Sequence, residues 1–257
     1  PVCGGINLED ISAPRCFEIE ARLRELLDIP VFHDDQHGTA VVVLAALRNA
    51  LKLVKKDLGK TKIVLNGAGA AGTAIARLLV LAGARNIIGF DSSGVINKKS
   101  ASNSDMRKWF IENCNPEQFE GNLSQAMNGA DIFIGVSAPN LLSEADIQSM
   151  AKGSIVFALA NPDPEIDPVL ARKHAAVVAT GRSDQPNQIN NVLAFPGIFR
   201  GLLDAGASKI TDELLVACAE AIASCVSESQ LNASFIVPSV FDTNVVKLVA
   251  DAVKRFT

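Results

Sequence analysis

The chain has 257 residues, of which 48% are hydrophobic and 20% charged, close to the averages of soluble globular proteins. This composition argues against a disordered, collagen-like or coiled-coil protein, and the length fits one large or two modest domains. Because 24 Lys and Arg residues face 28 Asp and Glu residues, the net charge is −4 and we expect no nucleic-acid partner.

The five cysteines are scattered and form no CxxC pair, so the sequence predicts neither a disulfide framework nor a thiolate zinc site. Free thiols favour a reducing, cytoplasmic location. The longest apolar stretch, residues 40–47, is far shorter than the ~18–20 residues that span a bilayer, so we expect a buried helix and no membrane partner. The chain opens at Pro1 without a signal peptide, as though it were cut from a longer one.

The first predicted elements are helical. Ser12 as N-cap and Pro14 in the first turn predict a helix over residues 12–27. A short strand or extended link over 28–32 and a polar turn over 33–38 follow. Residues 39–56 then form a second, mostly buried helix.

From residue 62 onward, short apolar runs alternate with helical patterns, which is typical of a parallel α/β sheet. Each run is continuously apolar, as strands covered on both faces require. A helix over 72–81 completes a first βαβ unit, and helices over 211–226 and 243–254 close the chain. The sequence therefore predicts a Rossmann-like, doubly wound parallel sheet with helices on both faces. Its predicted strands are residues 62–66, 86–91, 131–136, 154–160 and 175–179.

A GxGxxG pattern lies between the first predicted strand and its helix, the context in which this pattern predicts dinucleotide binding. Gly67 permits the tight turn, Gly69 lets the backbone approach a pyrophosphate, and Gly72 lets helix and strand pack closely. The helix N-terminus supplies free N–H groups for the phosphates. The alternative is a turn without a ligand. The predicted cofactor-binding residues of the turn are Gly67, Ala68, Gly69, Ala70, Ala71 and Gly72.

Asp91 ends the second predicted strand, where an acidic side chain can accept hydrogen bonds from the adenosine ribose. This position favours NAD over NADP. Two alternatives remain open at this point: Asp91 caps the following turn, or Ser92, Lys98 or Lys99 accommodates a 2′-phosphate.

Two acidic doublets, Glu9-Asp10 and Asp34-Asp35, each lie at the border of an extended segment and a helix. Adjacent carboxylates repel each other unless a cation offsets the charge. Oxygen ligands without cysteine suit a hard ion such as Mg²⁺ or Mn²⁺, whereas ordinary N-capping is the alternative. The two histidines that flank the second doublet do not share a helical face, so zinc is not predicted.

Five motifs, in order and nearly end to end, together resemble the short bacterial-type branch of malic enzymes. They are GGINLEDISAPRCFEIE (residues 4–20), IPVFHDDQHGTA (29–40), GAGAAG (67–72), ALANPDPE (158–165) and GRSDQPNQINNVLAFPGIFRG (181–201). The resemblance implies that Glu9, Asp10 and Asp35 bind the catalytic metal. It also implies that Asp34 neighbours the catalytic lysine of the family.

The resemblance further implies that Asn161 and Asn190 contact the substrate and the nicotinamide. Their amides can donate hydrogen bonds to a carboxylate without adding charge. Asn161 follows the end of a predicted strand, the edge at which open α/β sheets bind ligands. A turn with Pro162 is the alternative role of Asn161, and Asn191 is the alternative to Asn190.

The activity implied is oxidative decarboxylation of malate to pyruvate and CO₂, with reduction of NAD or NADP, in a homodimer or larger homo-oligomer. A malolactic enzyme or a non-catalytic nucleotide- and metal-binding module is the alternative. Family members carry an upstream segment with a tyrosine acid and a lysine base, whereas this chain contains no tyrosine. We therefore expect residues 1–37 to be a remnant of the metal and substrate domain, residues 38–257 to be the dinucleotide-binding domain, and the isolated chain to be inactive.

Overall fold

The centre of the molecule is a six-stranded sheet in the order β5-β4-β3-β6-β7-β8, seen in a computed structural model that describes residues 2–101 and 104–257. All neighbouring strands are parallel except β4 and β5. The chain builds β4 on one side of β3 and then crosses to place β6 on the other side, so a topological switch point lies between β3 and β6. The predicted doubly wound sheet is confirmed. Its strands are β3 (Lys62–Asn66), β4 (Asn86–Asp91), β5 (Gly94–Val95), β6 (Ile132–Gly135), β7 (Ile155–Ala158) and β8 (Val177–Thr180).

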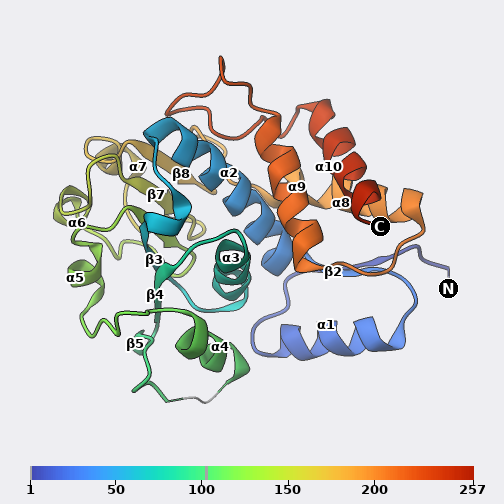
Figure 1. The fold of residues 1–257 in the computed structure, drawn as a ribbon, viewed down its shortest axis with the longest axis horizontal. Coiled ribbons are helices and arrows are strands. Elements are labelled where there is room, and N and C mark those ends of the chain that lie inside the picture. Colours follow the sequence, from blue (N-terminus) through green and yellow to red (C-terminus); the bar gives the residue numbers. More distant parts are fainter. Residues whose placement is uncertain (1, 102–103) are drawn as a thin grey trace.

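Helices cover both faces of this sheet (Figure 1). Ile63 and Leu65 of β3 pack into a core shared with α2, α3, α9 and α10, whereas Val64 packs into a second core with α5 and α6. This alternation explains why each strand reads as continuously apolar. The helices are α1 (Arg15–Leu26), α2 (Thr39–Val54), α3 (Ala70–Leu81), α4 (Asp105–Asn113), α5 (Leu123–Met127), α6 (Glu144–Gln148), α7 (Pro168–Ala171), α8 (Phe195–Ala205), α9 (Asp212–Ser224) and α10 (Thr243–Phe256).

The N-terminal part of the chain lies beside the main sheet. Strands β1 (Ile6–Leu8) and β2 (Val31–His33) form a separate parallel pair joined by α1. The predicted cap of this first helix is wrong, because α1 begins after Pro14 and no side chain caps it. Whether this part belongs to a second domain stays a prediction.

The predicted polar turn before α2 is also wrong, because Asp34–Gly38 forms a π-helical turn, η1, that continues directly into α2. The combined stretch Asp34–Val54 is long and apolar enough to cross a membrane by length and composition alone. In the fold, 67% of its most apolar window is buried. It packs against α3 and α9 as a core helix, so its length and composition are weak support for a membrane span.

Two 3₁₀ turns complete the secondary structure of the residues that the structure describes: η2 (Leu58–Lys60) leads into β3, and η3 (Asn191–Leu193) leads into α8. Asp57 caps η2 by accepting the backbone N–H of Gly59 at 2.9 Å. The helices α4, α5, α6, α7 and α8 and the strands β1 and β5 were not predicted. All five cysteines are free thiols.

Candidate active site

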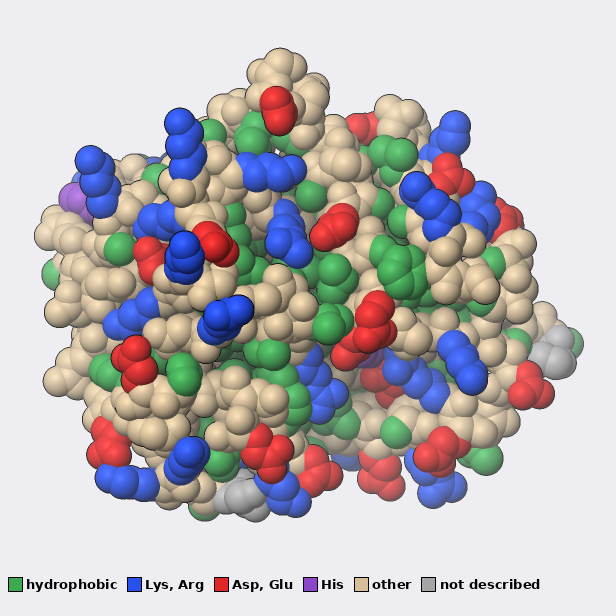
Figure 2. All heavy atoms as spheres, in the orientation of Figure 1, with side chains coloured by type: hydrophobic (Ala, Val, Ile, Leu, Met, Phe, Trp, Pro, Cys, Tyr) green, Lys and Arg blue, Asp and Glu red, His purple; other side chains and the backbone are tan. Residues whose placement is uncertain are grey.

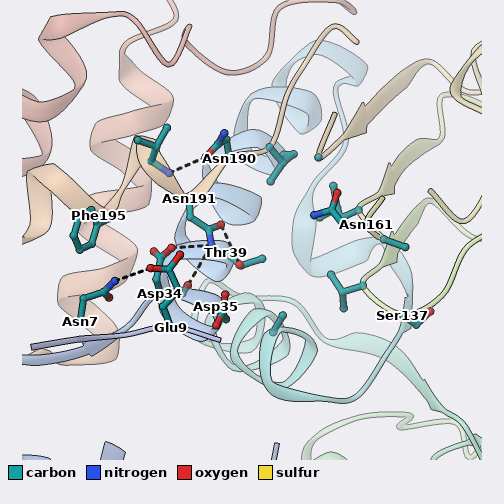
Figure 3. Close-up of a pocket in the computed structure, with 17 residues that line it drawn as sticks. Asn7, Glu9, Asp34, Asp35, Thr39, Ser137, Asn161, Asn190, Asn191 and Phe195 are labelled. Atoms are coloured by element: carbon teal, nitrogen blue, oxygen red, sulfur yellow. Dashed lines mark hydrogen bonds between the residues drawn. The ribbon is translucent and has the colours of Figure 1, made fainter. Parts of the chain in front are cut away.

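A cleft of about 650 Å³ opens at the carboxyl ends of β6, β7 and β8. Figure 3 shows Glu9, Asp34 and Asp35 on one side of it and Asn161 and Ser137 on the other. The cleft also reaches Ala71, in the first turn of α3. Residues from both the N-terminal part and the Rossmann-like sheet therefore line one space, at the sheet edge where open α/β folds bind ligands.

The three glycines of the GxGxxG turn have different surroundings. A Cβ on Gly67 would lie 2.7 Å from the carbonyl oxygen of Val136, and one on Gly72 would lie 1.9 Å from that of Gly67. A Cβ on Gly69 would meet no atom within 4 Å. The fold itself therefore requires the outer two glycines, whereas the space at Gly69 is open, as the approach of a pyrophosphate needs.

Asp91 is held by two contacts at the end of β4. Its Oδ1 accepts the backbone N–H of Ser93 at 2.8 Å, so the turn-capping alternative is present in the structure. Its Oδ2 lies 3.2 Å from a guanidinium nitrogen of Arg107, whose side chain is only 14% exposed. Arg107 was missed in the sequence, since it lies on the unpredicted helix α4. The role of Asp91 toward a ribose stays a prediction.

The two acidic doublets come together, although not symmetrically. The backbone N–H of Asp10 donates to Oδ2 of Asp35 at 2.9 Å. Glu9, Asp34 and Asp35 line the cleft, whereas Asp10 does not. Asp10 instead has an exposed side chain and a left-handed backbone, with φ of 56°.

Asp34 is the most enclosed of these carboxylates. Asn191 donates to its Oδ2 at 3.2 Å, while its Oδ1 is buried without a hydrogen-bond partner in the described structure. Burial raises the pKa of Asp34, the Asn191 hydrogen bond opposes that rise, and the nearby carboxylates of Glu9 and Asp35 add to it. A cation in the cleft would relieve this repulsion.

The donor chemistry of the cleft fits a hard divalent ion, because it offers carboxylate oxygens and no thiolate. The geometry is incomplete, since no group of three Asp, Glu, His or Cys side chains within residues 2–101 and 104–257 is arranged to hold a metal. The structure brings Glu9 and Asp35 to the cleft and leaves Asp10 at its edge. The three-carboxylate site stays a prediction.

The histidines beside the second doublet do not form a zinc pair. His33 ends β2 and is fully buried, and both of its ring nitrogens lack a hydrogen-bond partner in the part of the chain that the structure describes. His37 lies on η1 and instead meets Glu20 at 2.7 Å.

Asparagine amides also line the cleft. Asn161 follows β7, and Asn190 caps η3 by accepting the N–H of Val192 at 3.0 Å. Asn191 is engaged with the carboxylate side, because it accepts from the Thr39 hydroxyl at 3.0 Å as well as donating to Asp34. This commitment favours Asn190 over Asn191 as the residue facing a ligand.

Two buried carboxylates support the cleft and were missed in the sequence. Glu20 of α1 accepts from Gln36 at 3.1 Å and contacts His37 and Arg24 at 2.7 Å each, which ties α1 to η1. The His37 contact and nearby Arg24 lower the pKa of Glu20 against the effect of its burial. This network fixes the turn that carries Asp34 and Asp35.

Glu165 supports the opposite side of the cleft, where Ser137 and Asn161 lie. It is fully buried and accepts the backbone N–H groups of Ser137 and Ala160, at 3.1 Å each. These two amides belong to the loops after β6 and β7, which both line the cleft. The only signal in the sequence was the position of Glu165 in the ALANPDPE motif, and its partners could not be inferred.

Comparison with known proteins gives a consistent result. Residues 36–256 match the family described as "Malic enzyme, NAD binding domain". The chain is 58% identical to the NAD-dependent malic enzyme of Geobacillus stearothermophilus, over 98% of the chain and 53% of that protein. It is 52% identical to the bifunctional malic/malolactic enzyme of Bacillus subtilis, over 99% of the chain and 63% of that protein.

Solved structures agree. The NAD-dependent malic enzyme of Thermotoga maritima superposes with a TM-score of 0.92 at 48% identity, covering 98% of this chain and 66% of that one. The malic enzyme of Entamoeba histolytica gives a TM-score of 0.93 at 42% identity, covering 98% and 54%. The chain thus spans between half and two thirds of these relatives. Because the family match covers most of the chain and these relatives share its fold at 42–48% identity, the chain belongs to the malic enzyme family.

Proposed function

We propose that this chain supplies the dinucleotide-binding and metal-binding parts of an enzyme that converts malate to pyruvate and CO₂ while reducing NAD or NADP. One observation carries the proposal: a single cleft joins the carboxylates of Glu9 and Asp35 to the amide of Asn161 and to the first turn of α3. The names of the relatives support it, and several of them are called NAD- or NADP-dependent malic enzymes.

The residues of the chain would bind and orient the reactants. Asn161 and Asn190 would donate hydrogen bonds to a substrate carboxylate, and the α3 N-terminus would hold the cofactor pyrophosphate. Glu9 and Asp35, with Asp10 beside them, would hold Mg²⁺ or Mn²⁺. When bound, that ion supplies Lewis-acid polarisation of the substrate oxygens.

We further propose that NAD is preferred over NADP. Asp91 is the acidic residue at the end of β4, and its charge would repel a 2′-phosphate. A 2′-phosphate that pairs with Arg107 would first have to displace Asp91 from it. Calorimetric dissociation constants for the two cofactors test this preference, and tighter NADP binding would overturn it.

The activity itself is tested by comparing two lengths of protein. The 257-residue chain contains no tyrosine, so the general acid expected from the family is absent from it. An acid or base typically contributes ~10²–10⁴-fold to rate, and we expect negligible malate oxidation by the chain alone. A longer chain carrying the upstream segment should restore Mn²⁺-dependent pyruvate formation. No turnover in the longer chain would instead support a non-catalytic binding module.

A malolactic activity is the second candidate, because the Bacillus subtilis relative is named a bifunctional malic/malolactic enzyme. The same cleft would then retain the cofactor and release lactate. Product analysis by NMR separates the two, since free NADH with pyruvate indicates the malic reaction. Assembly into a homodimer or larger homo-oligomer stays a prediction.

A further inference from the structure

A second cleft, of about 570 Å³, lies at the opposite end of α2 from the candidate active site. It is lined by the C-terminal half of α2, by η2 and by the turn between α3 and β4. The two clefts share no lining residue, and their nearest lining residues on α2, Thr39 and Arg48, lie about 14 Å apart along the helix axis. The two sites are therefore distinct.

The lining of this second cleft is strongly basic, although the chain is acidic overall. Asp57 is its only acidic lining residue, and the carboxylate of Asp57 already caps η2. Figure 2 shows Lys and Arg side chains gathered over the C-terminal part of α2 and the segment that follows it. The six basic lining residues are Arg48, Lys52, Lys55, Lys56, Lys60 and Arg85.

Few of these charges are neutralised within the chain. Lys56 pairs with Asp131 at 2.7 Å, and Arg48 reaches the largely exposed Glu220 at 3.5 Å, a contact worth little in water. The other four have no ion-pair partner among the described residues. The Nε atom of Arg48 is, in addition, buried without a hydrogen-bond partner in the described structure.

The second cleft has more basic residues than the end of one helix would explain. Basic residues in the last turn of a helix offset its negative dipole end, which accounts for Lys52 on α2. Lys60 on η2 and Arg85 before β4 come from other elements and converge on the same cleft. Proteins bind multiply charged anions in clefts that several cationic side chains line together.

We propose that this cleft binds a small molecule carrying two or more linked phosphate groups. Its volume lies within the ~300–1,000 Å³ typical of ligand sites. The net charge of −4 disfavours a nucleic acid as the occupant. Linked phosphates match several separated cations better than a single phosphate does, because each phosphate group can meet its own cation.

The test is calorimetric titration of the chain with tripolyphosphate at 150 mM salt, near physiological ionic strength. The charge-reversal pair Lys52→Glu with Arg85→Glu should weaken binding by at least about tenfold. The matched control is Lys209→Glu with Lys247→Glu, two exposed lysines outside the cleft, which should bind as the unmodified chain does. Inorganic phosphate should bind at least about tenfold more weakly than tripolyphosphate.

Other results would overturn the proposal. Equal loss in both double variants would show general attraction to positive charge, and equal affinity of the cleft variant and the unmodified chain would place binding elsewhere. Absence of binding to the unmodified chain would also refute it. A thermal unfolding scan of each variant checks folding, and if the cleft pair fails to fold, Lys52→Gln with Arg85→Gln replaces it. The glycine-rich turn could also bind tripolyphosphate. The tripolyphosphate affinity of the Gly69→Val variant shows how much of the binding occurs at that turn.

Discussion

Glu165 accepts a hydrogen bond from the backbone N–H of Ser137, although 28 residues separate them in sequence. Its other oxygen accepts the N–H of Ala160, so one buried carboxylate joins the loops after β6 and β7. No space remains between Glu165 and the sheet, since a Cβ on Gly135 would lie 2.3 Å from the Glu165 carboxyl carbon. The cleft wall thus depends on a side chain that does not face the cleft.

Glu165→Gln should weaken this wall. The glutamine keeps one acceptor oxygen, but its NH₂ group meets the other backbone N–H, which loses its acceptor. We expect a loss of about 1–3 kcal/mol in the free energy of unfolding and weaker dinucleotide binding, measured by urea unfolding and calorimetry. Asp146→Asn is the control, because Asp146 also accepts a backbone N–H, that of Ser143 at 2.8 Å, but lies on α6 outside the cleft. Equal loss of dinucleotide affinity in both variants would contradict the assignment.

The same carboxylate should give a pH dependence of stability. Burial raises the pKa of Glu165 above its ordinary value of 4.5, against the opposing effect of the Ala160 and Ser137 amides. Between 4.5 and the raised pKa, the folded state holds more protons than the unfolded state. The contribution of Glu165 to stability therefore falls as pH rises through this interval. The slope of unfolding free energy against pH should become less negative there in Glu165→Gln, and an unchanged slope would contradict the raised pKa.

Substitutions in the glycine-rich turn should separate binding from folding. Gly69 has φ of −89°, which any residue can adopt, and its Cβ position is free. Gly69→Val should therefore fold normally and lose dinucleotide affinity in a calorimetric titration. Gly72→Ala should instead lower the unfolding temperature, because its Cβ would clash with the Gly67 carbonyl. Unaltered dinucleotide affinity in Gly69→Val would refute the proposed pyrophosphate site.

Asp35→Asn should lower the affinity of the chain for Mn²⁺ by about tenfold or more, because a charged oxygen ligand becomes neutral. The amide oxygen can still accept the Asp10 N–H, so the local fold should survive. Free Mn²⁺ is measured by electron paramagnetic resonance. Asp57→Asn, remote from the cleft, should leave the affinity unchanged. Equal Mn²⁺ affinities for all three proteins would argue against the metal site.

The cysteines should differ in reactivity. Burial raises the pKa of the Cys114 and Cys218 thiols to about 12, whereas Cys3 is exposed. At pH 8, a disulfide reagent should label Cys3 rapidly and reach Cys114 and Cys218 only on unfolding. The fast phase should vanish in Cys3→Ser, and its persistence would mean that another thiol is accessible.

The strands and the glycine-rich turn could be predicted because each rests on local sequence. Strands covered on both faces are continuously apolar, and the turn carries its own glycines beside β3. Helix α8 was missed because Pro196 and two glycines interrupt its sequence, although Gly197 and Gly201 allow close packing on α10. The π-turn was missed because its polar residues read as a loop, whereas buried contacts from α1 stabilise it.

The cleft residues were predicted largely through resemblance, and their supporting partners were not. Glu20 and Gln36 are 16 residues apart, and Glu165 lies 28 residues from Ser137, so no local pattern reveals either contact. Arg107 escaped notice for the same reason, 16 positions after Asp91 on another element. A charged side chain can be buried only when a partner offsets its charge. Where that partner is distant in sequence, a single sequence does not reveal the pair.

The π-turn η1 also sets the helical phase between β2 and α2. The N–H of Thr39 bonds to the carbonyl of Asp34, five positions back, so the turn holds one residue more than an α-helical turn would. A turn that absorbs an extra residue leaves the residues after it in phase, so the apolar face of α2 keeps its place in the core. Deleting one residue after Asp35 would let this stretch close as an ordinary α-helical turn, with little change in the direction of α2. The extra length of η1 thus belongs to the acidic side of the site, and its loss would leave the Rossmann core intact.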